Sequence, residues 1–134
     1  LPLTEGWLDT VKKETGGRGV DVVVDPVGGQ AFDVAVRVLA TEGRLLVIGF
    51  AAGGIPTVKV NRLLLRNVSV VGVGWGEFVN RNPGAQAEVG AALSTLVDAG
   101  LRPPAPVRFP LSEGAAALQS LADGGINGKL VLEP

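Results

Sequence analysis

The chain has 134 residues, of which 46% are hydrophobic, and 12 basic and 13 acidic residues give it a net charge of -1. That length suits one domain with an ordinary core, and the basic residues are spread along the sequence, which argues against a nucleic-acid partner or a polybasic membrane patch. The absence of Cys and His excludes a disulfide framework, a zinc finger, a Cys nucleophile and a His-based acid–base pair within this chain, and we expect no metal site.

The first 50 residues predict alternating helices and strands. Thr4 can cap a first helix. Val20–Val24 is rich in β-branched residues, which predicts a strand buried on most of both faces, as in parallel sheets. A helix is predicted over Gln30–Leu39 with its exit at Gly43, followed by a second strand over Arg44–Phe50.

The middle of the chain continues this alternation. Asn61–Arg66 predicts a short helix, although a strand remains possible for Leu63–Leu65. Val68–Gly74 predicts a third buried strand, and an irregular loop is expected from there through Gly84. A long helix is predicted over Ala85–Ala99. The order of elements up to Gly74 favours right-handed parallel crossovers.

The composition changes at Pro103, where a proline-rich stretch begins. Val107–Phe109 predicts a short strand, Ser112 can cap a helix that ends near Ala122, and Lys129–Leu132 predicts a final strand. We therefore expect a domain boundary between residues 102 and 103, with residues 1–102 and 103–134 as separate packing units.

A search for a phosphate-binding loop fails. Gly72 and Gly74 begin a G-x-G pattern, but Glu77 stands where the third glycine is needed, and the Gly49–Gly54 stretch lacks the lysine of a P-loop. The cradle for a pyrophosphate is therefore not encoded in these residues. Gly72 and Gly74 either contact a cofactor or let a strand pass closely under a helix, and both interpretations stay open.

Three predicted strands end in segments that expose their backbone: Asp25–Gly28, Gly49–Phe50 and Gly72–Trp75. In a parallel sheet these ends lie side by side and form a row of free N–H and C=O groups. Such a row suits a flat, amide-bearing ring such as nicotinamide, whose carboxamide needs a donor and an acceptor. Asp25 is expected to stabilise its own turn and not to transfer a proton.

Several segments together resemble the quinone oxidoreductase branch of the medium-chain dehydrogenase/reductase superfamily. They are Asp25-Pro-Val-Gly-Gly29 with Phe32, Gly43–Phe50, Asn61–Asn67, Ser69–Gly74, Phe109–Leu118 and Gly128–Leu132. The similarity covers essentially the whole chain, and the order and spacing of the segments are more specific than any one of them.

The resemblance implies an NADPH-dependent reductase with a doubly wound α/β fold of strand order 3-2-1-4-5-6. This chain would supply strands 4–6 of that Rossmann-type parallel sheet, with helices on both faces, and a small carboxyl-terminal strand–helix–strand unit. The phosphate-binding turn and the catalytic domain would lie upstream. By position, the nicotinamide end would be lined by Val27, Gly28, Gly49, Phe50, Val73, Gly74 and Trp75, and the phosphate or ribose would be approached by Asn127 and Lys129.

Plainer interpretations stay open for three of these residues. Lys129 could be a solvated charge before an edge strand, and Phe50 and Trp75 could fill a core instead of contacting a planar substrate. The resemblance implies hydride transfer to a quinone or an activated carbonyl or enone without an obligatory side-chain base, so we name no catalytic residue.

The predicted partial sheet leaves open strand edges. The resemblance implies pairing of the Val68–Val73 strand across a two-fold axis, and the Val20–Val24 strand has a bare apolar edge, so we expect a homo-oligomer, a homodimer in the simplest case. One alternative function is a non-catalytic truncated module for oligomerisation or for complementing a separate amino-terminal piece. A methyltransferase-type domain fits less well, because no acidic ribose-binding strand end accompanies a glycine-rich first turn.

From the sequence we expect no targeting or membrane-spanning segment in this chain. Its longest uncharged and mostly apolar run, Leu45–Val58, is too short to span a bilayer and is broken by glycines and Pro56. No cationic start precedes a signal-type apolar region. We expect a soluble, cytoplasmic domain.

Overall fold

The computed structural model describes residues 6–126 and 128–134, which fall into two compact units, Leu1–Asn82 and Pro83–Pro134. The boundary between these units lies about 20 residues before the predicted one, which fell between residues 102 and 103. The assignment of residues 83–102 to the same unit as the sheet stays a prediction. No helix among the described residues is long and apolar enough to cross a membrane.

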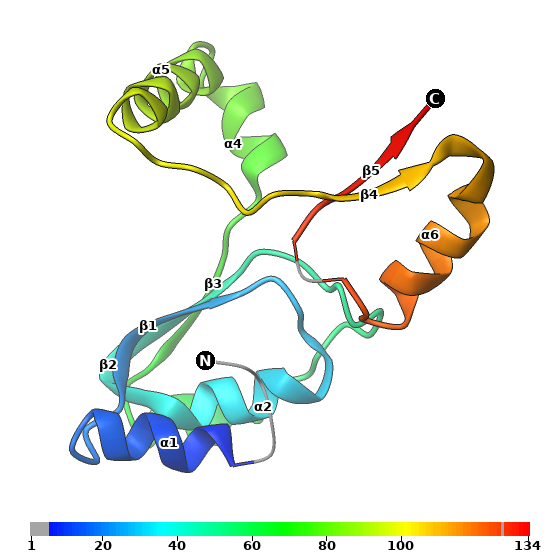
Figure 1. Ribbon diagram of the computed structural model, residues 1–134. Coiled ribbons are helices and arrows are strands. Elements are labelled where there is room, and N and C mark those ends of the chain that lie inside the picture. The colour runs from blue at the N-terminus through cyan, green and yellow to red at the C-terminus, as the bar shows by residue number, and fades with distance from the viewer. Residues whose placement is uncertain (1–5, 127) are drawn as a thin grey trace. The chain divides into compact units, whose positions relative to one another are not determined.

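The first unit is a parallel sheet with helices (Figure 1). Its three strands lie in the order β1-β2-β3, and both neighbouring pairs are parallel. The elements in chain order are α1 (Trp7–Glu14), β1 (Val20–Asp25), α2 (Gly29–Val38), β2 (Leu39–Val47), α3 (Val60–Leu64), β3 (Ser69–Gly72) and α4 (Trp75–Arg81). The predicted α/β class with a parallel sheet is confirmed, and helix is the correct choice for the segment around Leu63.

The start of β2 differs from the prediction. The sequence suggested a helix up to Leu39, an exit at Gly43 and a strand from Arg44, but β2 already begins at Leu39. Val20 pairs with Leu39 and Val22 with Arg44, so the register shifts between these pairs. Leu39 is fully buried, and this burial of an apolar side chain directly after α2 explains why the chain extends there without an intervening loop.

The core of the first unit lies on one face of its sheet. Phe32, Val36 and Leu45 belong to the buried cluster, and Val23 packs against it. Because side chains alternate along a strand, the neighbours of Val23 point to the opposite face. On that face Val22 is 48% exposed, and Val24 is 62% exposed. The expectation that β1 is buried on most of both faces is therefore wrong for this unit.

Helix α1 begins later than predicted, at Trp7, with Gly6 in the capping position at a φ of 85°. Thr4, the predicted cap, lies outside the described residues.

Helix α4 replaces most of the irregular loop that was expected before Gly84. Its side chains support one another, since Arg81 Nε donates to Glu77 Oε1 at 2.5 Å, four residues away. At the carboxyl end, Asn82 Nδ2 donates to the Phe78 carbonyl oxygen at 2.7 Å. The glycines at positions 74 and 76 made the segment look like a loop, and these two local contacts are what the sequence prediction overlooked.

The second unit contains the remaining elements, which are α5 (Ala85–Asp98), β4 (Val107–Pro110), a short 3-10 helix (Leu111–Glu113), α6 (Gly114–Ala122) and β5 (Leu130–Glu133). Strands β4 and β5 pair in parallel, and α6 connects them. The predicted cap at Ser112 is wrong, because this residue lies inside the 3-10 helix and α6 starts after Glu113.

Helix α5 ends where the sequence predicted. Gly100 has a φ of 105°, and its N–H donates to Val97 O at 3.0 Å, while the N–H of Leu101 donates to Leu96 O at 2.9 Å. This is the hydrogen-bond pattern of a Schellman motif, which needs a residue in the left-handed conformation.

Candidate functional site

The carboxyl ends of the three strands of the first unit lie in register. Asp25 at the end of β1 pairs with Val47 at the end of β2, and Val47 pairs with Gly72 at the end of β3. The chain leaves the sheet immediately after each of them. The predicted row of strand ends is therefore present, and it forms one rim of the sheet.

The turn after β1 is held by a buried carboxylate. Asp25 is 6% exposed, and its Oδ1 accepts hydrogen bonds from the backbone N–H groups of Val27 at 2.9 Å and Gly28 at 2.8 Å. The expected role of Asp25 in its own turn is confirmed. Its second oxygen, Oδ2, is also buried and has no hydrogen-bond partner among the described residues.

Gly28 lies against the loop that follows β2. Its φ is +67°, and a Cβ at this position would stand 3.2 Å from Phe50 Cδ1 and 3.4 Å from the carbonyl oxygen of Gly54. Both the backbone conformation and the close approach favour glycine. The structure thus brings Gly28 and Phe50, two predicted site residues, into direct contact.

The loop after β2 is tied to the turn after β1 by its backbone. Ala51 N–H donates to Pro26 O at 3.1 Å, and Ala52 N–H donates to Val27 O at 2.9 Å. Within residues 6–126 and 128–134, no hydrogen bond is recorded for the backbone N–H groups of Gly49 and Phe50. These two donors at the rim are free to bind an acceptor on a ligand.

A cavity of about 670 Å³ opens beside the end of β3. Its lining includes Val73, Gly74 and Trp75, which were predicted, and Phe78 and Asn82, which were not. The rings of Trp75 and Phe78 stack with their centroids 5.8 Å apart and an angle of 29° between their planes. The three-residue spacing of these aromatic rings on one face of a helix could have revealed Phe78 from the sequence.

The rim and this cavity share a chemical character. Phe50 is 42% exposed and Trp75 is 50% exposed, so both present ring surface to solvent. The backbone N–H groups of Gly49 and Phe50 and the open space beside Gly72 accompany these rings. Such an arrangement can hold a flat polar ring and leave space beside it for a second planar molecule.

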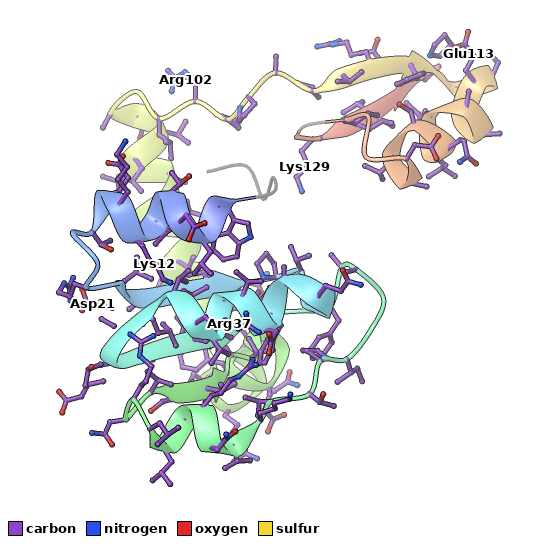
Figure 2. The ribbon with its side chains drawn as sticks, turned by 90° about the horizontal axis from the view of Figure 1, so that it is seen from below. Lys12, Asp21, Arg37, Arg102, Glu113 and Lys129 are labelled. Atoms are coloured by element: carbon purple, nitrogen blue, oxygen red, sulfur yellow. The ribbon has the colours of Figure 1, made fainter. Side chains whose placement is uncertain are left out.

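The other two predicted residues come from the part of the chain that follows the first unit. Asn127 lies outside the described residues. Lys129 belongs to the second unit, directly before β5 (Figure 2), where its carbonyl oxygen accepts a hydrogen bond of 2.9 Å from Val107 N and its side chain is exposed. The predicted contact of both residues with a phosphate or ribose stays a prediction.

The part of the chain that the structure describes contains no group of three or more His, Cys, Asp or Glu side chains that could hold a metal ion. The sequence as a whole has neither His nor Cys, the usual nitrogen and sulfur ligands of zinc. The residues present therefore do not fit a zinc site.

Comparison with known proteins identifies the family. The family model described as zinc-binding dehydrogenase matches residues 4–132. Quinone oxidoreductase-like protein 2 from Bos taurus is 38% identical over 125 residues, which is 92% of this chain and 36% of that protein. Prostaglandin reductase-3 from Mus musculus is 33% identical over 140 residues, which is 94% of this chain and 37% of that protein.

Two solved structures are also similar to this chain. A probable oxidoreductase from Mycobacterium abscessus is 56% identical with a TM-score of 0.78, and it covers all of this chain with 39% of its own length. A mycobacterial protein solved in complex with NADPH is 29% identical with a TM-score of 0.86, and it covers all of this chain with 43% of its own length. The chain thus spans well under half of each of these four proteins.

Proposed function

The chain belongs to the zinc-binding dehydrogenase family, and we propose that it is the carboxyl-terminal part of an NADPH-dependent quinone-type oxidoreductase. The observation that carries the proposal is the row of three strand ends in register, at Asp25, Val47 and Gly72, with free backbone donors beside it. Similarity to a mycobacterial protein solved with NADPH, at 29% identity, supports this choice of cofactor.

In this proposal the rim holds the nicotinamide end of NADPH. The N–H groups of Gly49 and Phe50 would donate to its carboxamide oxygen, and Val27 and Val73 would supply apolar contacts. Gly74 would leave space for the ring, and Gly28 would let Phe50 pack closely at the rim. The pyrophosphate and adenosine would be bound by residues outside this rim. Asn127 and Lys129 keep their proposed role near the phosphate or ribose.

The substrate would lie beside the cofactor against the exposed rings of Phe50 and Trp75, since aromatic faces suit a planar quinone, carbonyl or enone. NADPH supplies a hydride, and one proton from solvent completes the reduction of a quinone to a hydroquinone. No side chain of this chain is assigned as an acid or base. What these residues do is orient the two rings and exclude water between them.

We propose that the reaction uses no zinc bound by this chain, because the residues of the chain do not provide a set of zinc ligands. A cytoplasmic location, expected from the sequence, also belongs to the proposal and is tested by cell fractionation.

The test is NADPH oxidation by the full-length protein with a benzoquinone as acceptor, compared with the same reaction on NADH. The proposal predicts turnover that prefers NADPH and persists after dialysis against a zinc chelator. Tight binding of NADPH with no oxidation by any quinone or enone would contradict the oxidoreductase function.

A second candidate function, a non-catalytic assembly module, is favoured by the open edge of β1. Strand β1 is an outer strand of the three-stranded sheet, so one of its edges has no partner strand among the described residues. Beside its end lies a cavity of about 150 Å³ lined by Trp7, Val24 and Asp25 among others. The unpartnered Asp25 Oδ2 could accept a hydrogen bond from a strand added at this edge.

The same observation supports a homo-oligomer in either function, through the β1 edge or through the edge of β3. Light scattering of the full-length protein tests this. A single species with the mass of one chain at high concentration would contradict assembly, and normal assembly without NADPH oxidation would favour the non-catalytic module.

A further inference from the structure

Four basic side chains line one cavity of the first unit, far from the rim described above. Lys12 comes from α1, Arg37 from the last turn of α2, Arg62 from α3, and Arg66 from the turn after α3. The cavity has a volume of about 390 Å³. Figure 2 shows Lys12 and Arg37 on the neighbouring helices α1 and α2.

One carboxylate holds two of these arginines in place. Arg37 Nη2 donates to Asp33 Oδ2 at 2.6 Å, and Arg62 Nη1 donates to Asp33 Oδ1. The side chain of Arg62 is 26% exposed, so it is largely fixed among its neighbours. A guanidinium group has five N–H donors, and each arginine gives one of them to Asp33 in these contacts, so donors remain for a ligand.

Arg66 is fixed in a different way. Its Nη1 donates to the carbonyl oxygen of Arg37 at 2.9 Å, at the carboxyl end of α2. This contact stabilises the last turn of the helix, and no ion pair between Arg66 and a carboxylate is recorded for residues 6–126 and 128–134. The lining contains these four basic side chains and no acidic one, and among the described residues Asp33 is the carboxylate that pairs with two of them.

The cavity also has an apolar wall, formed by Val36 and Leu65. Val36 is 3% exposed and belongs to the core, whereas Leu65 is 77% exposed. A bare inorganic ion would leave this wall and much of the volume unused, since cavities of about 300–1,000 Å³ suit small organic molecules. The lining therefore matches an anionic group attached to a small apolar body.

This cavity is separate from the rim that would hold nicotinamide. Helix α2 starts at Gly29, beside the rim, and Arg37 lies eight residues further along the helix, a rise of about 12 Å. The residue after α2, Leu39, pairs with Val20, the first residue of β1. The basic end of α2 thus lies toward the opposite edge of the sheet, where the strands begin.

From these observations we infer that the cavity lined by Lys12, Arg37, Arg62 and Arg66 binds a small organic phosphomonoester. Arginine binds a phosphate through paired N–H···O bonds. The guanidinium groups of Arg37 and Arg62 are already held by Asp33, so they lose little conformational freedom when a phosphate binds. Lys12 adds a positive charge from α1, and the organic part lies against the apolar wall, mainly against Leu65. The site is independent of the proposed oxidoreductase function.

The test uses the full-length protein, saturated with NADP⁺ to occupy the cofactor site, and phenyl phosphate as the probe, followed by calorimetry. We expect one binding site whose affinity falls about tenfold in Arg66→Gln, the size expected for the loss of one charge-assisted interaction. Arg108→Gln is the matched control, because it removes one positive charge and one ion pair in the second unit, and it should leave the affinity unchanged.

Two further measurements keep the test decisive. Lys12→Gln removes a cavity charge without touching the Asp33 contacts, so it should weaken binding and keeps the proposal testable even if Arg66→Gln does not fold. Inorganic phosphate should bind more weakly than phenyl phosphate, because it cannot use the apolar wall. The proposal is overturned if phenyl phosphate does not bind, or if Arg66→Gln and Arg108→Gln weaken it equally.

Discussion

The buried carboxylate of Asp25 accepts a hydrogen bond of 2.8 Å from the backbone N–H of Gly28 and thereby closes the turn between β1 and α2. This contact fixes the position of Gly28, which in turn lies against Phe50. The geometry of the rim proposed to hold nicotinamide thus depends on a side chain that does not itself contact a ligand.

Replacing Asp25 with Ala should therefore destabilise the protein. The change leaves the N–H groups of Val27 and Gly28 without their acceptor. The hydrogen bond of Gly28 is buried, and an unsatisfied buried donor costs about 1–3 kcal/mol. Thermal unfolding measures the loss. Asp25→Asn retains the accepting oxygen and should lose less, and equal stability of Asp25→Ala and the native protein would show that the turn does not need this carboxylate.

Gly19→Ala should be more damaging than its position near a loop suggests. A Cβ there would stand 2.4 Å from the carbonyl oxygen of Val38, and φ is +90°. Gly17 has a φ of +83° and nothing within 4 Å, so Gly17→Ala measures the backbone cost alone. We expect a loss of about 1–2 kcal/mol for Gly17→Ala and roughly 3 kcal/mol or more for Gly19→Ala in chemical unfolding. Equal losses would contradict the close approach of α2 to Gly19.

The pair Arg18–Asp21 predicts a small pH effect at the start of β1. Chiefly through its hydrogen bonds, Arg18 lowers the pKa of Asp21 below the ordinary 3.8. Since the pKa is lower in the folded state, the stabilisation is present above the ordinary value and is lost as pH falls through the lowered pKa. Both side chains are largely exposed to solvent, so the effect on stability is slight.

NMR titration of the Asp21 carboxyl group measures this directly. Arg18→Gln should raise the pKa of Asp21 toward 3.8, and an unchanged pKa in that variant would show that the pair does not form in solution.

Phe50→Ala should impair quinone reduction without a comparable loss of stability. Phe50 is 42% exposed, so its removal costs little core packing, whereas stacking on a planar substrate is worth about 0.5–1.5 kcal/mol. We expect kcat/KM to fall by roughly two- to tenfold, mainly through KM. Ile55→Ala removes a 79% exposed apolar side chain from the same connection and serves as the control. Equal effects of the two variants would argue against stacking at Phe50.

The sequence predicted the order and type of most elements because buried β-branched strands and amphipathic helices have clear periodicities. It missed α4, where glycines obscure a helix that the Glu77–Arg81 pair supports. It also misplaced the start of β2, because burial of Leu39 is decided by contacts with β1 and α2 that no local pattern contains.

The candidate sites also differ in whether a local sequence pattern reveals them. The strand ends were found because Asp25, Gly49 and Gly72 interrupt apolar runs, and parallel pairing then aligns them. The basic cavity could not be found in the same way. Lys12, Arg37 and Arg66 are far apart in the sequence, and only the packing of α1, α2 and α3 brings them together.

The central claim is that the three aligned strand ends hold the nicotinamide ring of NADPH, and backbone amide chemical shifts of the full-length protein test it most directly. The account predicts that NADP⁺ shifts the amides of Val27, Gly28, Gly49, Phe50 and Trp75, whereas adenosine 2′,5′-bisphosphate, which lacks nicotinamide, leaves them in place. Identical shifts with both ligands, or no shifts at these amides when NADP⁺ is bound, would contradict it.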